Sequence, residues 1–233
     1  MIDFRKNYRA KISKIVLITV VLFCTSTVKS LAQYRESYNT FIGGLVAGAN
    51  FTQVDGDGYR GYHKTGINAG GIVYLPFGDM DLPVEGTIAL SMEVLYVQKG
   101  SASNGPSQAY GLLSQNINLQ YGEVPIQLNY FRGTQKSSVG AGLSIGYLGR
   151  YEELIDKGGG KIIKNGFPFR RYELSFVLTG NIHIFKGFFI SPRFQYALIP
   201  IRVSTGGYGR NQQFNNVLSL RLMYLIGKRG QRY

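Results

Sequence analysis

The sequence predicts an all-β chain folded as an eight-stranded antiparallel up-and-down transmembrane β-barrel. Eight stretches between Phe41 and Ile226 alternate apolar and polar residues with period two, which is typical of strands with one wet and one apolar face. The connectors between these stretches are long and short by turns. Small barrels of bacterial outer membranes show this alternation, because their extracellular loops are long and their periplasmic turns are short.

The clearest alternation runs from Val84 to Tyr96, where the even positions are apolar and the odd positions include Glu85, Ser91 and Glu93. Leu174–Ile184 and Val124–Tyr130 repeat the pattern. The remaining strands are predicted at Phe41–Val54, Thr65–Leu75, Val139–Tyr147, Phe188–Tyr196 and Val217–Ile226. Each span is close to the 9–11 residues or so that a tilted strand needs to cross a bilayer.

Two local features interrupt this regularity. The apolar residues Ile117, Leu119 and Tyr121 fall on the opposite parity from Val124 onwards, so a β-bulge is predicted at Gly122. Pro125 and Pro192 lie inside predicted strands, where each removes one donor from the hydrogen-bond ladder.

The lengths of the connectors favour a barrel over a soluble sandwich, which also alternates. The long connectors are Asp55–Lys64, Val97–Asn116, Leu148–Arg171 and Ala197–Asn216, and the short ones are Gly78–Pro83, Arg132–Lys136 and Lys186–Gly187. Tyr and Phe residues cluster near the strand ends, where interfacial aromatic girdles are expected.

The N-terminal segment has the pattern of a secretory signal peptide. Five Lys and Arg residues precede the apolar run Ile15–Phe23, which is too short to span a membrane as a helix. Cleavage after Ala32 would leave residues 33–233 as an outer-membrane β-barrel domain. Cys24 could suggest lipid attachment, but the bulky Phe23 before it argues against a lipoprotein cleavage site.

A narrow eight-stranded barrel has an interior that side chains fill, so inward charges must be paired. The predicted interior charge network consists of Glu93, Glu123, Arg193, Arg221 and His183. We expect Arg193 and Arg221 to be neutralised by Glu93 and one other interior carboxylate. A gated pore lined by the same groups is the alternative.

The chain is basic, with a formal net charge of +13, and much of its positive charge falls in the predicted long loops. Such a rim could contact the phosphates of lipopolysaccharide, and a plain solvated rim is the alternative. Nucleic acid is not expected as a partner, because no binding motif is present. The candidate lipid-contacting residues are Arg60, Lys64, Arg150, Lys161, Lys164, Arg170 and Arg171, and Lys99 and Arg202 also fall in predicted loops.

No catalytic, cofactor-binding or metal-binding site is predicted. No Ser or second His stands at a spacing that would form a triad with His183. Asp55 and Asp57 resemble the start of a calcium loop, but Gly66 occupies the twelfth position, where a bidentate Glu is needed. The glycines before Lys161 lack the first glycine of a phosphate-binding loop.

Four segments carry a family resemblance: GLVAGANFTQVDGDG (44–58), SMEVLYVQKGS (91–101), YGEVPIQLNYF (121–131) and VGAGLSIGYL (139–148). Together they resemble the outer-membrane β-barrel family of Bacteroidetes-type bacteria that includes the PorT-like proteins. The resemblance implies a barrel without a shared catalytic motif, and for some members a role accessory to protein secretion.

The function predicted is therefore that of a non-enzymatic outer-membrane protein, acting as a structural or interaction element of the envelope. Its expected partners are outer-membrane lipid, lipopolysaccharide and other envelope or secretion proteins. A narrow pore or carrier for small solutes is the alternative, and a lipid-modifying barrel enzyme is a third hypothesis.

Overall fold

The computed structural model describes residues 41–57, 61–77, 86–103, 114–132, 137–156, 161–163, 169–202 and 212–226. The predicted signal peptide, Met1–Ala32, lies outside these residues. Within the described ranges, no helix is long and apolar enough to cross a membrane.

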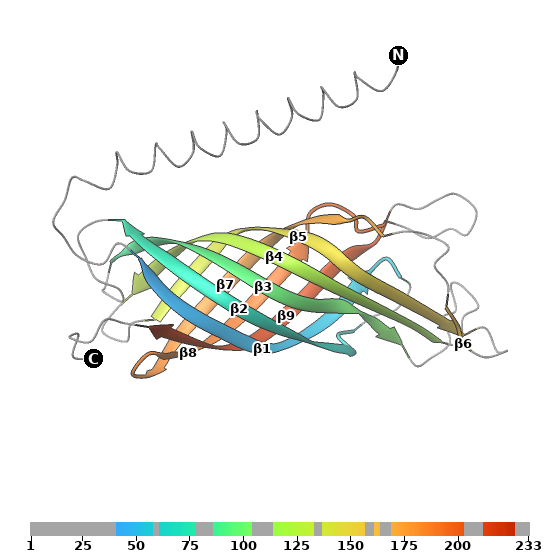
Figure 1. Cartoon of the computed structure of the whole chain (residues 1–233), viewed down its shortest axis with the longest axis horizontal. Coiled ribbons are helices and arrows are strands. Elements are labelled where there is room, and N and C mark those ends of the chain that lie inside the picture. The colour runs from blue at the N-terminus through green and yellow to red at the C-terminus, as the bar shows by residue number, and fades with distance from the viewer. Residues whose placement is uncertain are drawn as a thin grey trace, which may run out of the picture. The chain divides into compact units, whose positions relative to one another are not determined.

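Eight long strands form a closed antiparallel barrel, as the sequence predicts (Figure 1). Each long strand pairs with the next one in the chain, and β9 pairs with β1. The pairing of β4 with β5 completes the circle. The three-residue β6 pairs with the last three residues of β5, Leu154–Asp156. The bounds are β1 Ile42–Asp55, β2 Lys64–Phe77, β3 Ile88–Ser103, β4 Ser114–Arg132, β5 Ser137–Asp156, β6 Lys161–Ile163, β7 Tyr172–Phe185, β8 Phe188–Ala197 and β9 Phe214–Ile226.

The two ends of the barrel differ in their connectors. The turn end carries the β2–β3, β4–β5 and β7–β8 connectors and the start of β1, and the loop end carries the β1–β2, β3–β4, β5–β7 and β8–β9 connectors. The β7–β8 connector is the predicted two-residue turn, in which Lys186 has a positive φ of 50°. Because β3 begins at Ile88 rather than Val84, ten residues separate β2 from β3 and eight separate β1 from β2, so the predicted alternation of long and short connectors fails there; residues 78–85 lie outside the described residues.

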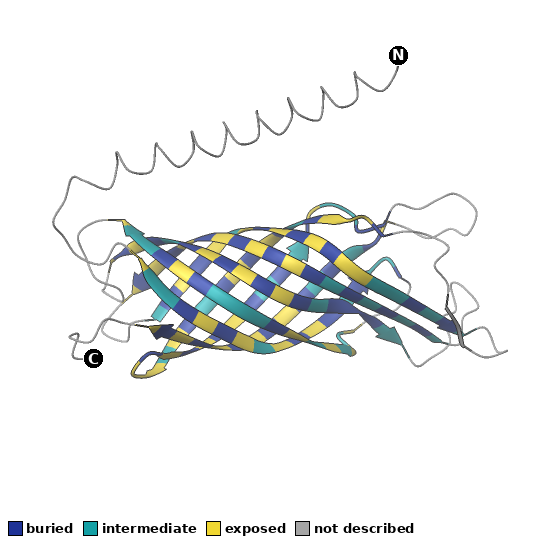
Figure 2. Cartoon of the chain, in the orientation of Figure 1, coloured by how far each residue is buried: buried dark blue, intermediate teal, exposed yellow. Residues whose placement is uncertain are grey.

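Buried and exposed residues alternate along the long strands (Figure 2). On β4, Val124, Ile126 and Leu128 are exposed, whereas Glu123 and Gln127 are buried in the barrel. The same holds for Leu218, Leu220 and Leu222 on β9 and for Phe176, Leu178 and Ile182 on β7. This arrangement is the reverse of a water-soluble barrel, and it is the one required when hydrocarbon surrounds the strands.

The bulge predicted at Gly122 is absent from β4, and the prediction is wrong. Odd residues of β4 face inward along its whole length, so Ile117, Leu119 and Tyr121 are buried in the interior. The register shift in this region falls between Gln120 and Tyr121, whose partners on β5 are Arg150 and Leu148, so Gly149 is the extra residue. The apolar residues of β4 point inward before Gly122 and outward after it, because the surroundings of the strand change there. The alternation of inward and outward positions continues without a break.

Strands β3, β4 and β5 run further toward the loop end than predicted. They reach Ser103, Ser114 and Asp156, so the connectors beyond them are shorter than the sequence suggests. The outward residues of β4 in this extension are Asn116, Asn118 and Gln120. Polar outward residues above an apolar band indicate that these extensions lie beyond the hydrocarbon.

Both strand prolines are accommodated by one-sided gaps in the ladder. No pairs join Glu93 and Val94 of β3 to β4 opposite Pro125, and β4 keeps its pairing with β5 there. Pro192 has the same effect on the β7–β8 ladder, while its pairing with Leu220 of β9 is kept. A strand can therefore hold a proline inside the barrel when its other flank stays paired.

We predict that Ile126→Arg and Gln120→Arg differ in cost, although both residues face outward on β4. A cationic side chain at the middle of the apolar band costs about 2–4 kcal/mol, and one beyond its edge costs about 0–1 kcal/mol. Urea unfolding of the two variants in phospholipid vesicles measures both values. Equal costs at the two positions would contradict the assigned edge of the band.

Candidate functional site

The centre of the barrel holds one carboxylate shared by two guanidinium groups. Glu93 of β3 forms ion pairs with Arg193 of β8 and with Arg221 of β9, the second at 2.9 Å between Oε2 and Nη1. All three side chains are buried. Gln127 donates a hydrogen bond to Glu93 at 3.1 Å, and Arg221 donates to Ser191 at 2.8 Å. We call these residues the central cluster.

A second cluster lies closer to the loop end, around Lys99 of β3. Its ammonium group contacts the carboxylates of Glu123 and Glu173, the latter at 2.7 Å. Glu173 also accepts hydrogen bonds from Asn215 at 2.5 Å and from Ser175 at 2.7 Å. One cation thus faces two carboxylates, which is the inverse of the central cluster.

A third ionic group lies at the loop end of the interior. Arg202 donates to both carboxylate oxygens of Glu153, at 3.2 and 2.9 Å, and Gln115 donates to the same carboxylate at 2.6 Å. The guanidinium carbon of Arg202 lies 3.8 Å from the ring centroid of Phe169, a cation–π arrangement.

The interior is closed by contacts between opposite walls of the barrel. Asn181 of β7 donates to the Tyr74 hydroxyl of β2 at 3.4 Å, near the turn end. The Glu93–Arg193 ion pair joins β3 to β8 at mid-height. Asn215 of β9 donates to the Tyr121 hydroxyl of β4 at 3.4 Å, nearer the loop end. Each pair joins strands four apart in the eight-strand circle, so side chains meet across the lumen at three levels.

Apolar side chains fill much of the remaining interior. One buried group surrounds Tyr74 and Phe131, whose rings pack edge to face with centroids 5.8 Å apart. A second group at the loop end includes Leu119, Leu148 and Ile201. The lumen is therefore a packed core with three ionic layers.

The predicted charge network is changed in two respects. Among the described residues, Arg193 and Arg221 both pair with Glu93 and with no second carboxylate, and Glu123, which was expected in the same network, pairs with Lys99 instead. His183 does not join the network: it is only partly buried near the β7–β8 turn, where its Nε2 lies 2.8 Å from the carbonyl oxygen of Lys186. Its position two residues before the turn end of β7 leaves it at the rim.

Sequence reasoning missed Lys99 and Arg202 as interior residues, because both fell in predicted loops. Lys99 has the same parity as Glu93 on a strand that continues past Tyr96, so a longer strand would have placed it inside. Arg202 follows β8 and is paired with Gln213 across an isolated bridge, which the alternation pattern does not reveal.

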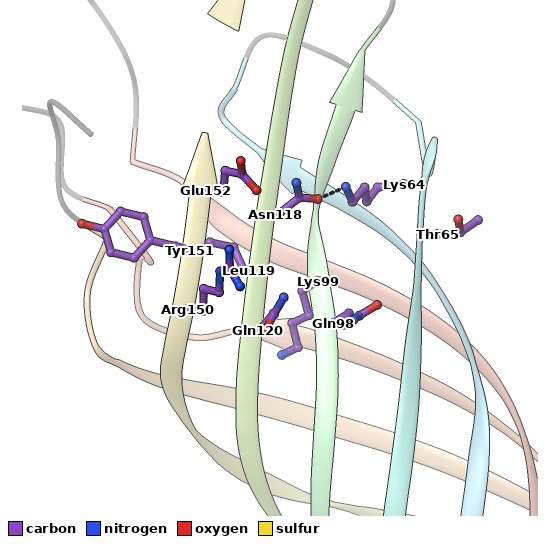
Figure 3. A pocket seen from close by; sticks show the side chains of 10 residues that line it. All are labelled: Lys64, Thr65, Gln98, Lys99, Asn118, Leu119, Gln120, Arg150, Tyr151 and Glu152. Atoms are coloured by element: carbon purple, nitrogen blue, oxygen red, sulfur yellow. Dashed lines mark hydrogen bonds between the residues drawn. The ribbon is translucent and has the colours of Figure 1, made fainter. Parts of the chain in front are cut away.

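The seven candidate lipid-contacting residues lie in different parts of the chain, and the structure does not describe all of them. Arg60 and Lys164 lie outside the described residues, as does the side chain of Lys161 in β6. Arg170 and Arg171 are exposed at the loop end. Lys64 and Arg150 line one cavity of about 280 Å³ in the wall formed by β2 to β5 (Figure 3).

The described residues at the two ends of the β1–β2 connector are held to other strands by polar contacts. Asp57 is buried and accepts a hydrogen bond from Ser101 at 2.5 Å, and Tyr62 donates to Asn216 at 2.8 Å. Burial and the negative charge of Asp55 raise the pKa of the Tyr62 phenol, which keeps it a donor. Among the described residues, no group of three or more His, Cys, Asp or Glu could hold a metal ion.

Comparison with known proteins gives distant structural likeness. No family model matches the chain. No curated protein sequence matches it significantly. Solved structures with some likeness include Ail, the attachment invasion locus protein of Yersinia pestis (12% identity, 81% of this chain, 100% of that chain, TM-score 0.45). Neisserial surface protein A has 10% identity over 81% of this chain and 99% of its own, with a TM-score of 0.44.

The outer membrane protein AlkL has 14% identity over 85% of this chain and 97% of its own, with a TM-score of 0.35. At these identities and scores the likeness transfers no function. The closed barrel follows from this chain's own strand pairing, and the resemblance to PorT-like barrels stays a prediction.

We predict that Glu93→Gln destabilises the barrel by about 3–5 kcal/mol, because it leaves Arg193 and Arg221 buried without a counter-charge. Glu152→Gln, which removes a half-exposed carboxylate from the outer wall, should cost less than about 1 kcal/mol. Urea unfolding of both variants in the same vesicles measures the difference. A cost for Glu93→Gln as small as that of Glu152→Gln would show that the central cluster does not stabilise the fold.

Proposed function

We propose that this protein is an integral outer-membrane β-barrel that acts through its surfaces, as a non-enzymatic structural or interaction element of the envelope. The observation that carries the proposal is the distribution of side chains: apolar residues cover the outward face, and ion-paired residues fill the interior. A barrel with this distribution cannot expose its outer face to water without a large apolar penalty.

The closed interior supports an interaction role over a pore. Opposite walls meet at three levels, and the central cluster leaves both arginines paired to one carboxylate. Opening a passage would separate buried charges from their partners. The described interior also brings together no nucleophile, base and orienting group of the kind that acyl transfer requires.

The surfaces available for such a role are at the loop end. Arg170 and Arg171 are exposed there, and strands β3 to β5 project beyond the apolar band. Exposed cations at this position suit contact with the phosphates of lipopolysaccharide. A role accessory to protein secretion, which the PorT-like resemblance implies, would use the same projecting face to bind an envelope protein.

We predict that the purified protein inserts into phospholipid vesicles and gives no stepwise conductance in planar bilayers. Among the described residues, opposite walls of the barrel are in contact at three levels, so the current should stay at the level of protein-free bilayers. A control variant that carries Glu93→Ala, Arg193→Ala and Arg221→Ala loses the central cluster and should leak. Reproducible conductance steps from the unmodified protein would favour the narrow pore instead.

A further inference from the structure

We propose that the cavity lined by Lys64 and Arg150 binds the phosphate headgroup of a membrane lipid, with an acyl chain of that lipid lying in a notch at Gly122. The inference rests on the membrane insertion proposed above and specifies one lipid site on the outer wall. The shared ligand chemistry is a phosphate attached to acyl chains, whether in a glycerophospholipid or in lipid A.

The cavity lies in a polar band on β3, β4 and β5. Strand pairing places Gln98, Gln120 and Arg150 in one row across the three strands, with Gly100, Asn118 and Glu152 in a row closer to the loop end. Figure 3 shows the side chains of Gln98, Asn118, Gln120, Arg150 and Glu152 together with Lys64 at the wall. They supply amide and cationic donors suited to phosphate oxygens.

The row on the turn-end side of this band is aromatic and has one gap. Tyr96 pairs with Gly122, and Gly122 pairs with Tyr147. Both tyrosines are exposed on the outer face, with 41% and 50% of their surfaces accessible. A Cβ built on Gly122 would meet no atom within 4 Å, so the glycine leaves an open notch between two girdle tyrosines.

Directly on the turn-end side of the notch, the outward face becomes apolar at Val124 and Ile126. A polar cavity, a gap in the girdle and an apolar wall therefore follow one another along β4. This is the sequence of environments that a lipid presents from its phosphate through its glycerol or sugar to its acyl chain.

Lys64 and Arg150 differ in the contacts that they already make. Lys64 reaches across β3 to Asn118 and also donates to Asn116 at 2.9 Å. The Arg150 side chain is exposed and makes no hydrogen bond or ion pair with any residue that the structure describes. A phosphate between them would give Arg150 a counter-ion.

The cavity is too small for a large ligand and contains one carboxylate. Its volume of about 280 Å³ is at the lower limit of the roughly 300–1,000 Å³ of small-molecule sites, which fits a headgroup. Glu152 would repel a second phosphate but can accept a hydrogen bond from an ammonium group. The lining therefore favours a phosphate that carries an ethanolamine over one that carries an uncharged group or a further anion.

Native mass spectrometry of the detergent-solubilised full chain tests the site with five separate probes: phosphatidylethanolamine, phosphatidylglycerol, lipid A, diacylglycerol and inorganic phosphate. We expect one tightly held copy of a phosphate lipid and no retention of diacylglycerol. Comparing phosphatidylethanolamine with lipid A identifies the source of the phosphate, and comparing it with phosphatidylglycerol tests the role of Glu152.

Three variants separate the parts of the site. Lys64→Gln with Arg150→Gln should weaken binding of the phosphate lipid at least tenfold. Gly122→Leu fills the notch and should weaken lipid binding without changing the binding of inorganic phosphate. Arg132→Gln removes an exposed charge at the turn end of β4, away from the cavity, and should bind like the unmodified chain.

Two results would overturn the site while leaving the proposed function intact. One is a chain that inserts into vesicles but retains no phosphate lipid, and the other is equal loss of binding in Arg132→Gln and in the Lys64 and Arg150 variant. Failure of the unmodified chain to insert into vesicles at all would instead count against the proposed function.

Discussion

Every part of this structure depends on the closure of the hydrogen-bond ladder in surroundings that cannot replace it. In hydrocarbon, an unpaired backbone N–H or C=O group costs several kcal/mol, so an open sheet edge is excluded within the apolar band. The pairing of β4 with β5 closes the circle, and the gaps at Pro125 and Pro192 each affect only one flank. In a closed barrel, the outward face of the sheet contacts hydrocarbon and the inward face lines the interior, so the two faces need different side chains.

The inward face solves the problem of burying charge in a narrow space by changing the balance of charges from layer to layer. The central cluster has two cations on one carboxylate, the Lys99 cluster has one cation between two carboxylates, and Arg202 is matched by Glu153. Taken together, these three layers pair four cations with four carboxylates. The excess positive charge of the central cluster is compensated by the excess negative charge of the Lys99 cluster, so the buried interior stays close to neutral.

Much of this fold could be predicted from the sequence, because period-two alternation reports directly which residues share a face. It placed the eight strands, and it placed Glu93, Arg193 and Arg221 together inside. Alternation does not report which medium each face meets. Beyond Gly122 the outward residues of β4 become polar and most of its inward residues become apolar, so an uninterrupted strand looked like two strands out of phase.

The same limitation explains the residues that sequence reasoning missed. Lys99 lies on a strand extension beyond the apolar band, where the membrane pattern stops but the pleat continues. Its partners Glu123 and Glu173 are on β4 and β7, and only the closed circle of strands brings them together. The cavity at Lys64 and Arg150 likewise depends on the register of four strands, which hairpin-level patterns do not fix.

The central claim is that hydrocarbon covers the outward face up to Gly122 and that water covers it beyond. The chain's one cysteine, Cys24, lies in the segment predicted to be removed, so single cysteines introduced at positions 116–130 of β4 can carry unique nitroxide labels. In bilayers, we predict high accessibility to oxygen at 124, 126 and 128 and high accessibility to a water-soluble nickel chelate at 116, 118 and 120, with low values at the odd positions. Uniform access of the nickel chelate to all the even positions would contradict the account.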